Sequence, residues 1–235
     1  MKNELTVIIP CKNEEAYIYR TLESISKQIS YRGVRIIVTD NFSTDNTKLE
    51  IMRARLDFSL NLEIVEGGPV SVARNNGALL ATTPYIVFID ADAILLDTRI
   101  FSSSMALAKK AKYKLITCKI KSVSNSWRSK LIFSVFNFIQ ANLLKSPFST
   151  GVYFFTKRDE FNRLGGFDEE ATQSEDYLLS KKYNRRDFII LKKCVGQDDR
   201  RFKQMGYIGF LKLIIKNYLN RNDLSYFRKN TNYWG

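Results

Sequence analysis

The chain has 235 residues, of which 45% are hydrophobic and 26% are charged, a mixture typical of a globular protein with a substantial core. Lys and Arg number 37 against 24 Asp and Glu, so the formal net charge is +13, and histidine is absent. This absence excludes a Ser-His-Asp triad, a histidine general base and a histidine-ligated zinc site. The length fits one domain, or one domain with a small appendage.

Cysteine usage and hydropathy bear on the compartment. Cys11, Cys118 and Cys194 are odd in number and far apart, so they form neither a disulfide framework nor a zinc motif. The first residues lead into only a short apolar run, and no stretch approaches the roughly 20 apolar residues that span a bilayer. We therefore expect a cytoplasmic protein without a signal peptide, with the inner face of the membrane as a further location.

The first half of the chain alternates strand and helix patterns. Short β-branched runs predict strands over residues 5–10, 34–39, 62–65 and 85–89. Apolar residues at helical spacing predict helices over residues 14–29, 46–56 and 72–81. Ser43 or Thr44 is the expected cap of the second helix. The alternation predicts an α/β fold with a mostly parallel, Rossmann-like central sheet flanked by helices.

The second half is less regular. We expect strands over residues 113–120, 151–156 and 188–192. We expect helices over residues 127–148, 157–164 and 208–219, and another that opens at Ser174 as its cap. Gly165 and Gly166 indicate a C-cap and turn.

Acidic residues follow three of the predicted strands. Glu14 lies after the first strand, Asp40 ends the second, and Asp90 and Asp92 follow the fourth. Parallel α/β sheets bind ligands at the carboxyl ends of their strands, so these carboxylates should meet at one edge. The Asp90-x-Asp92 pair (a DXD motif) can share a divalent cation with a diphosphate. The alternative is a pair of turn acids at a strand end.

Asp40 and Arg74 have two interpretations each. Asp40 could accept a hydrogen bond from a nucleobase or a ribose, or it could cap a helix. Arg74 could contact a base or a phosphate from the same edge, or it could be a surface arginine.

Two later motifs also carry chemistry. Glu175 and Asp176 open a helix, and one of these carboxylates could act as the general base that a chain without histidine needs. The alternative is that they only complement the helix dipole. Arg200 and Arg201 could neutralise a diphosphate leaving group, or they could be surface charge.

Together these motifs resemble the family 2 glycosyltransferases, which have the GT-A fold. The resemblance covers about residues 5–205. It rests on Val7-Ile8-Ile9-Pro10 with Asn13-Glu14, Asp40-Asn41-x-Ser43-Thr44-Asp45, Ala73-Arg74-Asn75-x-Gly77, Asp90-x-Asp92, Gly151, Gly165-Gly166-Phe167-Asp168-Glu169, Glu175-Asp176 and Arg200-Arg201-Phe202.

The resemblance implies a nucleotide-sugar donor, usually UDP-linked, and a divalent metal ion, Mn²⁺ or Mg²⁺. It implies that Asp40 contacts the uracil and that Pro10, Glu14 and Arg74 help to bind the nucleoside. It further implies that Asp90 lies on the ribose side of the metal site and that Asp92 is the metal ligand.

For the reaction, the resemblance implies a single displacement with inversion at the anomeric carbon. Asp176 matches the catalytic base, with Glu175 beside it, and Arg200 and Arg201 match arginines that stabilise the pyrophosphate. Residues 1–205 would form the GT-A domain, with residues 1–112 binding the nucleotide-sugar and the smaller region 113–205 binding the acceptor. Residues 206–235 would form a basic, apolar, helical appendage.

Two features depart from the family pattern. Phe42 stands where a glycine is usual, next to the residue that contacts the base. Many relatives also have a late histidine that contacts the metal, so phosphate, water or another oxygen ligand would complete the metal shell here.

Two segments mix bulky apolar residues with basic ones, residues 127–138 and residues 207–219, the second with Lys212 and Lys216 one helical turn apart. Further basic and aromatic residues follow them: Arg221, Arg228, Lys229, Tyr233 and Trp234. This composition suits the interface of an anionic membrane, whereas the alternative is packing on the core or in a dimer. We expect peripheral membrane association and a lipid-linked or saccharide acceptor, as in surface polysaccharide or glycolipid synthesis.

Two other functions use the same features. The basic charge is compatible with sugar transfer to a modified base in nucleic acid, although no DNA-binding motif is visible. A catalytically inert nucleotide-binding module is the third hypothesis. The presence of Asp40, Asp90, Asp92 and Asp176 disfavours the inert module.

Overall fold

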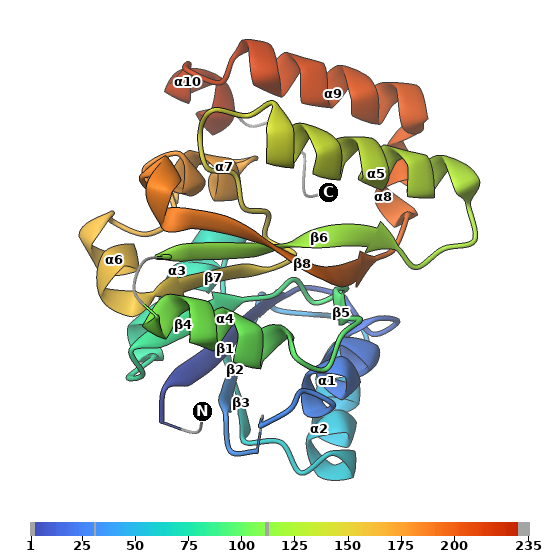
Figure 1. Ribbon diagram of the computed structural model, residues 1–235. Coiled ribbons are helices and arrows are strands. Elements are labelled where there is room, and N and C mark those ends of the chain that lie inside the picture. The colour runs from blue at the N-terminus through green and yellow to red at the C-terminus, as the bar shows by residue number, and fades with distance from the viewer. Residues whose placement is uncertain (1–2, 31, 111–112, 230–235) are drawn as a thin grey trace.

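The computed structural model describes residues 3–30, 32–110 and 113–229. Its centre is an eight-stranded sheet with the order β3-β2-β1-β4-β7-β6-β8-β5, and helices pack on both faces of this sheet (Figure 1). The predicted α/β fold with a mostly parallel central sheet flanked by helices is confirmed. Tyr233 and Trp234 lie outside the described residues.

The first half forms the parallel part of the sheet. Its strands are β1 (Leu5–Cys11), β2 (Arg35–Asp40), β3 (Leu62–Glu66) and β4 (Tyr85–Phe88). Its helices are α1 (Ile18–Ser26), α2 (Thr47–Asp57) and α3 (Val70–Leu80). Because β1 pairs in parallel with both β2 and β4, the carboxyl ends of these strands lie at one edge.

The second half adds strands of both directions. They are β5 (Ile94–Leu95), β6 (Leu115–Ser122), β7 (Phe154–Lys157) and β8 (Phe188–Gln197). The helices are α4 (Ile100–Lys109), α5 (Trp127–Asn142), α6 (Arg158–Arg163), α7 (Glu175–Ser180), the short 3₁₀ turn η1 (Arg185–Asp187), α8 (Arg200–Met205), α9 (Tyr207–Leu219) and α10 (Leu224–Arg228). Strand β7 is antiparallel to β4 and β6, whereas β8 is parallel to β6. None of the helices within the described residues has the length and apolar character needed to cross a bilayer.

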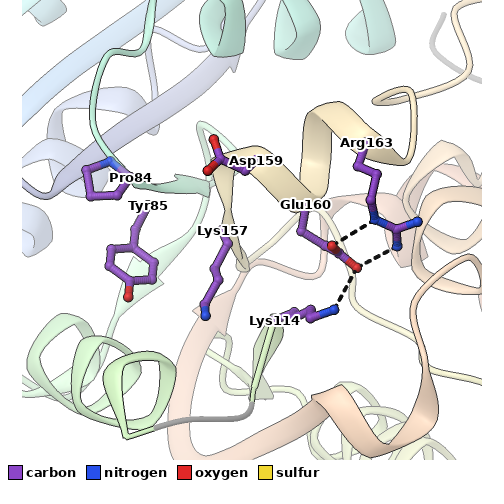
Figure 2. Close-up of a pocket in the computed structure, with 7 residues that line it drawn as sticks. All are labelled: Pro84, Tyr85, Lys114, Lys157, Asp159, Glu160 and Arg163. Atoms are coloured by element: carbon purple, nitrogen blue, oxygen red, sulfur yellow. Dashed lines mark hydrogen bonds and ion pairs between the residues drawn. The ribbon is translucent and has the colours of Figure 1, made fainter.

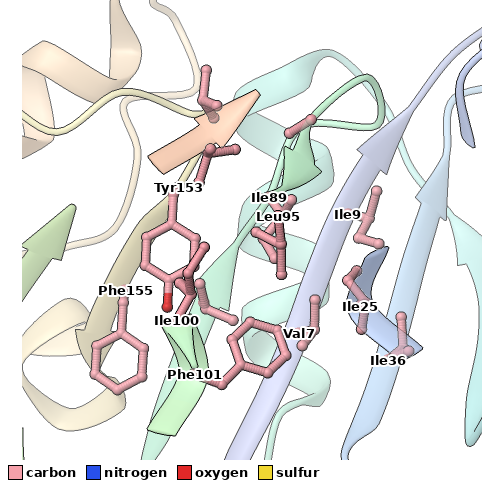
Figure 3. Close-up of a cluster of buried hydrophobic side chains, with 14 of the residues drawn as sticks. Val7, Ile9, Ile25, Ile36, Ile89, Leu95, Ile100, Phe101, Tyr153 and Phe155 are labelled. Atoms are coloured by element: carbon pink, nitrogen blue, oxygen red, sulfur yellow. The ribbon is translucent and has the colours of Figure 1, made fainter. Parts of the chain in front are cut away.

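Both faces of the sheet are buried, which explains the continuous apolar run of the first strand. Val7 and Ile9 pack in the cluster shown in Figure 3, whereas Ile8 points to the opposite cluster with Phe88 and Phe154. Phe88 is fully buried against three other phenylalanine rings, so its truncation to alanine would cost about 3–5 kcal/mol.

Several helices and strands begin or end elsewhere than predicted, because backbone groups find other partners. The helix predicted from residue 14 begins at Ile18, since the Glu14 N–H donates to Thr47 Oγ1 at 2.7 Å. The strand predicted from Gly151 begins at Phe154, and the helix predicted to end at residue 148 ends at Asn142. Helix α4, strand β5 and helix α8 are additions to the predicted elements.

The predicted helix caps fare differently. Neither Ser43 nor Thr44 caps α2, because Asp45 Oδ1 accepts the Thr47 N–H at 3.0 Å while the Ser43 hydroxyl donates to Asp40. Ser174 occupies the N-cap position of α7 as predicted, but it has a left-handed conformation, and its hydroxyl accepts from Asn217 and makes no capping bond. The turn at Gly165 and Gly166 is confirmed, since both have positive φ after α6.

Candidate active site

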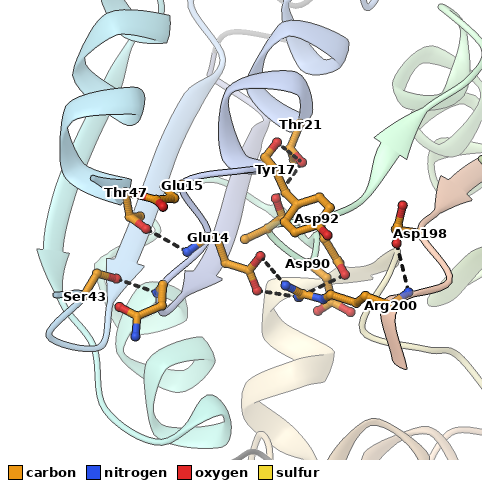
Figure 4. A network of polar contacts seen from close by, with 12 residues as sticks. Glu14, Glu15, Tyr17, Thr21, Ser43, Thr47, Asp90, Asp92, Asp198 and Arg200 are labelled. Carbon is orange, nitrogen blue, oxygen red and sulfur yellow. Dashed lines mark hydrogen bonds and ion pairs between the residues drawn. The ribbon is translucent and has the colours of Figure 1, made fainter. Parts of the chain in front are cut away.

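Four carboxylates gather where the parallel strands end, as predicted. Asp40 is the last residue of β2. Glu14 follows β1, and Asp90 and Asp92 follow β4 (Figure 4). Helix α8, which follows β8, brings Arg200 to the same place. The site therefore combines the first loop of the chain with one of its last helices.

Arg200 bridges two of these carboxylates. Its guanidinium nitrogens donate to the two oxygens of Glu14 at 2.8 and 2.5 Å, and Nη2 lies 3.1 Å from Asp92 Oδ2. The same guanidinium lies 4.7 Å from the centre of the Tyr17 ring. A partly buried, bidentate ion pair between an arginine and a carboxylate, such as Arg200 with Glu14, is among the stronger polar contacts in proteins.

Burial raises the pKa of two carboxyl groups at this edge, so a nearby positive charge is needed to favour their ionised forms. Burial raises the pKa of Asp92, the nearby Asp90 raises it further, and Arg200 and Arg201 oppose the rise. Burial likewise raises the pKa of Glu14, against the effect of Arg200. A cation is therefore electrostatically favourable here, and Arg200 and Arg201 already act on Asp92 in this sense.

The ligand chemistry fits a hard divalent cation. Asp90 and Asp92 offer carboxylate oxygens, which Mg²⁺ and Mn²⁺ prefer, and such ions commonly complete their shell with phosphate and water. Within residues 3–30, 32–110 and 113–229, no three His, Cys, Asp or Glu side chains gather closely enough to hold a metal by themselves. Asp90 and Asp92 are the two residues of this edge that could contribute ligands to such an ion.

Arg74 lies beneath the site and joins its two sides. Its side chain is 1% exposed, Nη2 lies 2.7 Å from Asp90 Oδ1, and Nη1 donates to Glu175 on α7. A Cβ on Gly151 would lie 2.1 Å from Arg74 Nη2, so only glycine leaves room for this ion pair. Arg74 therefore fixes α7 relative to the end of β4.

Asp176 lies next to this ion-paired cluster, in which Arg74 contacts Asp90 and Glu175. Its oxygens accept the Gly151 N–H at 2.9 Å and the Tyr177 N–H at 2.7 Å, and no side chain of the described residues is paired with it. Burial and the neighbouring Glu175 raise the pKa of Asp176 to about 7, against the lowering effect of Arg74. A carboxylate with a pKa near neutrality suits general-base chemistry, whereas the buried Glu175 is tied to Arg74.

Asp40 lies beside a small cavity. Ser43 Oγ donates to Asp40 Oδ1 at 2.5 Å, and Lys48 Nζ lies 3.3 Å from Oδ2. The cavity has a volume of about 210 Å³, and its lining includes Asp40, Phe42, Lys48 and the end of β3. Pro10 is buried in β1 and pairs with Thr39, next to Asp40. The cavity is thus lined by three charged side chains and three apolar ones.

Some site residues were not among the predicted ones. Tyr17, Lys48 and the hydroxyl of Ser43 support Arg200 and Asp40 from neighbouring loops and helices. Their residue types are common at surfaces, so only the structure reveals their position. Gly151 belongs to one of the sequence motifs, but its N–H contacts Asp176, which lies 25 positions later in the chain, and no local pattern predicts this contact.

A second cavity, of about 270 Å³, lies away from these residues (Figure 2). It includes Pro84 and Tyr85 at the amino end of β4, whereas Asp90 follows the opposite end of that strand. Its Lys114 and Arg163 are already paired with Glu160. The cavity is therefore not part of the candidate site.

The sequence matches the model of Glycosyl transferase family 2 over residues 6–165. This match covers most of the chain and contains the strand-end carboxylates and Arg74. The chain belongs to glycosyl transferase family 2.

Curated relatives carry more specific names. A GalNAc(5)-diNAcBac-PP-undecaprenol beta-1,3-glucosyltransferase from Campylobacter jejuni is 24% identical over 197 residues, which are 80% of this chain and 62% of that protein. Validoxylamine A glucosyltransferase from Streptomyces hygroscopicus subsp. limoneus is 34% identical over 90 residues, 37% of this chain and 20% of that protein. The chain thus spans less than two thirds of the length of these relatives.

Solved structures share the fold. TarS from S. aureus in complex with UDP superposes with a TM-score of 0.63 and 21% identity, over 86% of this chain and 62% of its own. The mannosyltransferase PcManGT from Pyrobaculum calidifontis, in complex with GDP-Man and Mn²⁺, superposes with a TM-score of 0.67 and 21% identity, over 90% of this chain and 64% of its own. The GT-A fold expected from the sequence is confirmed.

Proposed function

We propose that this protein transfers a hexose from a nucleotide-sugar, UDP-linked, to a hydroxyl of a lipid-linked or saccharide acceptor, with inversion at the anomeric carbon. The observation that carries the proposal is the position of Asp176. This carboxylate has a pKa raised to about 7 and lies next to the Arg74–Glu175 ion pair that connects it to Asp90. The ion pairs of Arg74 thus connect a potential base to the edge at which we propose that the diphosphate binds.

The reaction follows from these groups. Asp176 would take the proton of the acceptor hydroxyl while the acceptor oxygen bonds to the anomeric carbon. The bond between that carbon and the diphosphate oxygen breaks, and its electron pair leaves with the diphosphate. Because one displacement occurs from the face opposite the leaving group, the configuration inverts. Arg200 and Arg201 would stabilise the negative charge on the departing diphosphate.

The donor side would use the remaining residues. Asp40 would accept a hydrogen bond from the uracil beside Phe42, with Pro10, Glu14 and the buried Arg74 shaping the nucleoside site. Asp90 and Asp92 would hold a Mn²⁺ or Mg²⁺ ion, which when bound neutralises charge on the diphosphate. In this proposal residues 1–112 bind the donor and residues 113–205 the acceptor.

The relatives support the nature of both substrates. The TarS complex contains UDP and the PcManGT complex contains GDP-Man with Mn²⁺, so a nucleotide-sugar and a metal suit this fold. The name of the Campylobacter jejuni relative includes an undecaprenol-linked acceptor, which supports a lipid-linked acceptor here. Cys11, Cys118 and Cys194 are all free, which fits our proposal that the protein works at the cytoplasmic face of a membrane.

Calorimetric titration with UDP, first with Mn²⁺ and then with the metal chelated, tests the donor side. We expect metal-dependent binding, and we expect Asp92→Ala to weaken it at least about tenfold because the ion loses a ligand. Asp159→Ala is the matched control, since that carboxylate is 93% exposed and lies at the distant cavity. Equal affinity of the wild type and Asp92→Ala would contradict the role of Asp92, and binding of GDP alone would contradict the UDP assignment.

A further inference from the structure

Helices α5 and α9 carry large apolar side chains on their solvent faces. On each helix these residues recur every three or four positions, so each set occupies one face. Trp127 is 68% exposed and Ile208 is 73% exposed, which is unusual for such side chains. We call the following residues the α5/α9 surface: Trp127, Leu131, Val135, Phe138, Ile208, Leu211, Ile215 and Leu219. A gathering of exposed apolar residues on this scale marks an interaction site.

The amino-terminal parts of the two helices are joined through contacts of Tyr207 and Phe202. The Tyr207 hydroxyl, at the start of α9, lies 3.0 and 3.3 Å from the hydroxyls of Ser126 and Ser129 at the start of α5. The Phe202 ring contacts Phe133 of α5 and Phe210 of α9 at ring-centre distances of 5.2 and 4.6 Å. Figure 1 shows α5 and α9 on the same side of the sheet, with α9 farther from the sheet than α5 in this view.

Charge distinguishes among the partners that could cover the surface. Arg128 and Lys130 of α5 and Lys212 and Lys216 of α9 are exposed, and neither helix contains an acidic residue. A second copy of the chain would bring the same positive charge to the contact and would be repelled. An anionic bilayer interface accepts both the apolar side chains and the basic ones.

The α5/α9 surface is also connected to the helix that carries Asp176. Asn217 of α9 donates to the hydroxyl of Ser174 at 3.1 Å, two residues before Asp176. Lys181, directly after α7, donates to the Arg221 carbonyl at 3.1 Å, just beyond α9. Helix α9 and the residues just after it therefore contact the segment that carries Asp176.

We propose that an anionic membrane docks on the α5/α9 surface and thereby presents a lipid-linked acceptor to Asp176. The presentation of the acceptor rests on the proposed function, whereas the docking itself does not. The apolar side chains enter the boundary between headgroups and acyl chains, and the four basic side chains contact the anionic headgroups.

Sedimentation with lipid vesicles tests the docking in the absence of any donor. We expect the protein to sediment with vesicles of phosphatidylcholine containing about one third phosphatidylglycerol, and not with phosphatidylcholine alone, because each basic residue contributes to anionic binding. High salt should weaken the binding, since it screens exposed charges. Leu131→Ser/Ile215→Ser and Lys212→Gln/Lys216→Gln should each weaken it at least about tenfold.

Matched variants elsewhere control for general effects of hydrophobicity and charge. Leu79→Ser removes an apolar side chain that is 82% exposed on α3, and Arg55→Gln/Lys110→Gln removes two exposed charges outside the surface. Both should bind vesicles like the wild type. The UDP titration of every variant separates this inference from the proposed function, because UDP binding should be unchanged throughout.

Three outcomes would overturn the docking. The first is a wild type that ignores anionic vesicles, and the second is equal loss in the surface and control variants. The third is a wild-type dimer that Leu131→Ser/Ile215→Ser converts to a monomer without any vesicle binding, which would assign the surface to a second copy. Retention on DNA without vesicle binding would assign the basic residues to nucleic acid instead.

Discussion

The sheet edge and the α5/α9 surface differ in whether their side chains find partners within the protein. At the sheet edge, charged groups pair with one another, as Arg74 does with Asp90 and Glu175. On the α5/α9 surface, apolar side chains such as Trp127 and Ile208 remain in solvent. The contrast indicates that the edge is organised by the chain itself, whereas the surface requires a partner. Substitutions should therefore damage chemistry and stability at the edge, and association at the surface.

The sharpest test of the edge is Asp176→Asn, which keeps the size of the side chain and removes the base. We expect transfer to fall by about 10²–10⁴-fold, because this is the usual contribution of a positioned general base. UDP affinity, measured by calorimetry, should be unchanged. Asp187→Asn, on the turn before β8, is the control and should keep full activity. An Asp176→Asn enzyme with wild-type turnover would remove Asp176 from the mechanism.

Arg74→Met tests whether the edge is held by its own ion pairs. The change leaves Asp90 and Glu175 without their buried cation, and we expect the free energy of unfolding to fall by about 3–5 kcal/mol. Urea titration followed by circular dichroism measures the loss. Leu131→Ser on the α5/α9 surface should change it by less than about 0.5 kcal/mol. Similar losses of unfolding free energy in Arg74→Met and Leu131→Ser would contradict the difference that we infer between the sheet edge and the α5/α9 surface.

The pH dependence of transfer reports on Asp176 directly. Its pKa is raised to about 7 in the folded protein by burial and by Glu175 on the same helix, while Arg74 from α3 lowers it. The carboxyl accepts a proton only when ionised, so the rate should rise roughly tenfold from pH 6 to pH 8 and level off above. A rate that is flat over this range would contradict the base assignment, and vesicle binding should not follow the same curve.

The raised pKa of Asp176 also affects stability, which should fall with rising pH while the rate of transfer increases. Because the pKa of Asp176 is higher in the folded protein than its ordinary value of 3.8, the folded state binds this proton more tightly than the unfolded chain does. The contribution is complete at low pH and is lost as the pH rises through about 7. The ionised form that favours catalysis is thus the less stable one.

Phe42→Gly probes a large apolar side chain that is exposed at the cavity beside Asp40. Phe42 has a φ of +50° and is 63% exposed, and glycine adopts this left-handed conformation without the steric cost of a Cβ. We expect the free energy of unfolding to rise by about 0.5–1 kcal/mol in urea titration, while UDP affinity falls because a ring beside Asp40 is lost. A variant with unchanged UDP affinity would show that Phe42 does not contact the nucleotide.

Sequence patterns predicted the parts of this molecule that local rules control. The strand runs and helical spacing located the sheet, and the position of Asp40, Asp90 and Asp92 at strand ends placed them at one edge. The pairings within the site follow from tertiary contacts that no local pattern encodes. Arg74 and Glu175 are 101 residues apart, and the room that Gly151 leaves for Arg74 appears only in three dimensions. The cap of α2 failed for a local reason, since the Ser43 hydroxyl bonds to the nearby Asp40 while Asp45 accepts from the Thr47 N–H.

The long separations in the site also bear on how the chain acquires activity. Glu14 and Arg200 are 186 residues apart, so every residue between them must be synthesised before this contact can form. Contacts between such distant residues are reached late, because the entropy of closing the intervening loop must first be overcome. Arg74 meets Glu175 under the same constraint. A nascent chain on the ribosome therefore lacks an assembled site, and competence for transfer arises only with the final docking of α7 and α8.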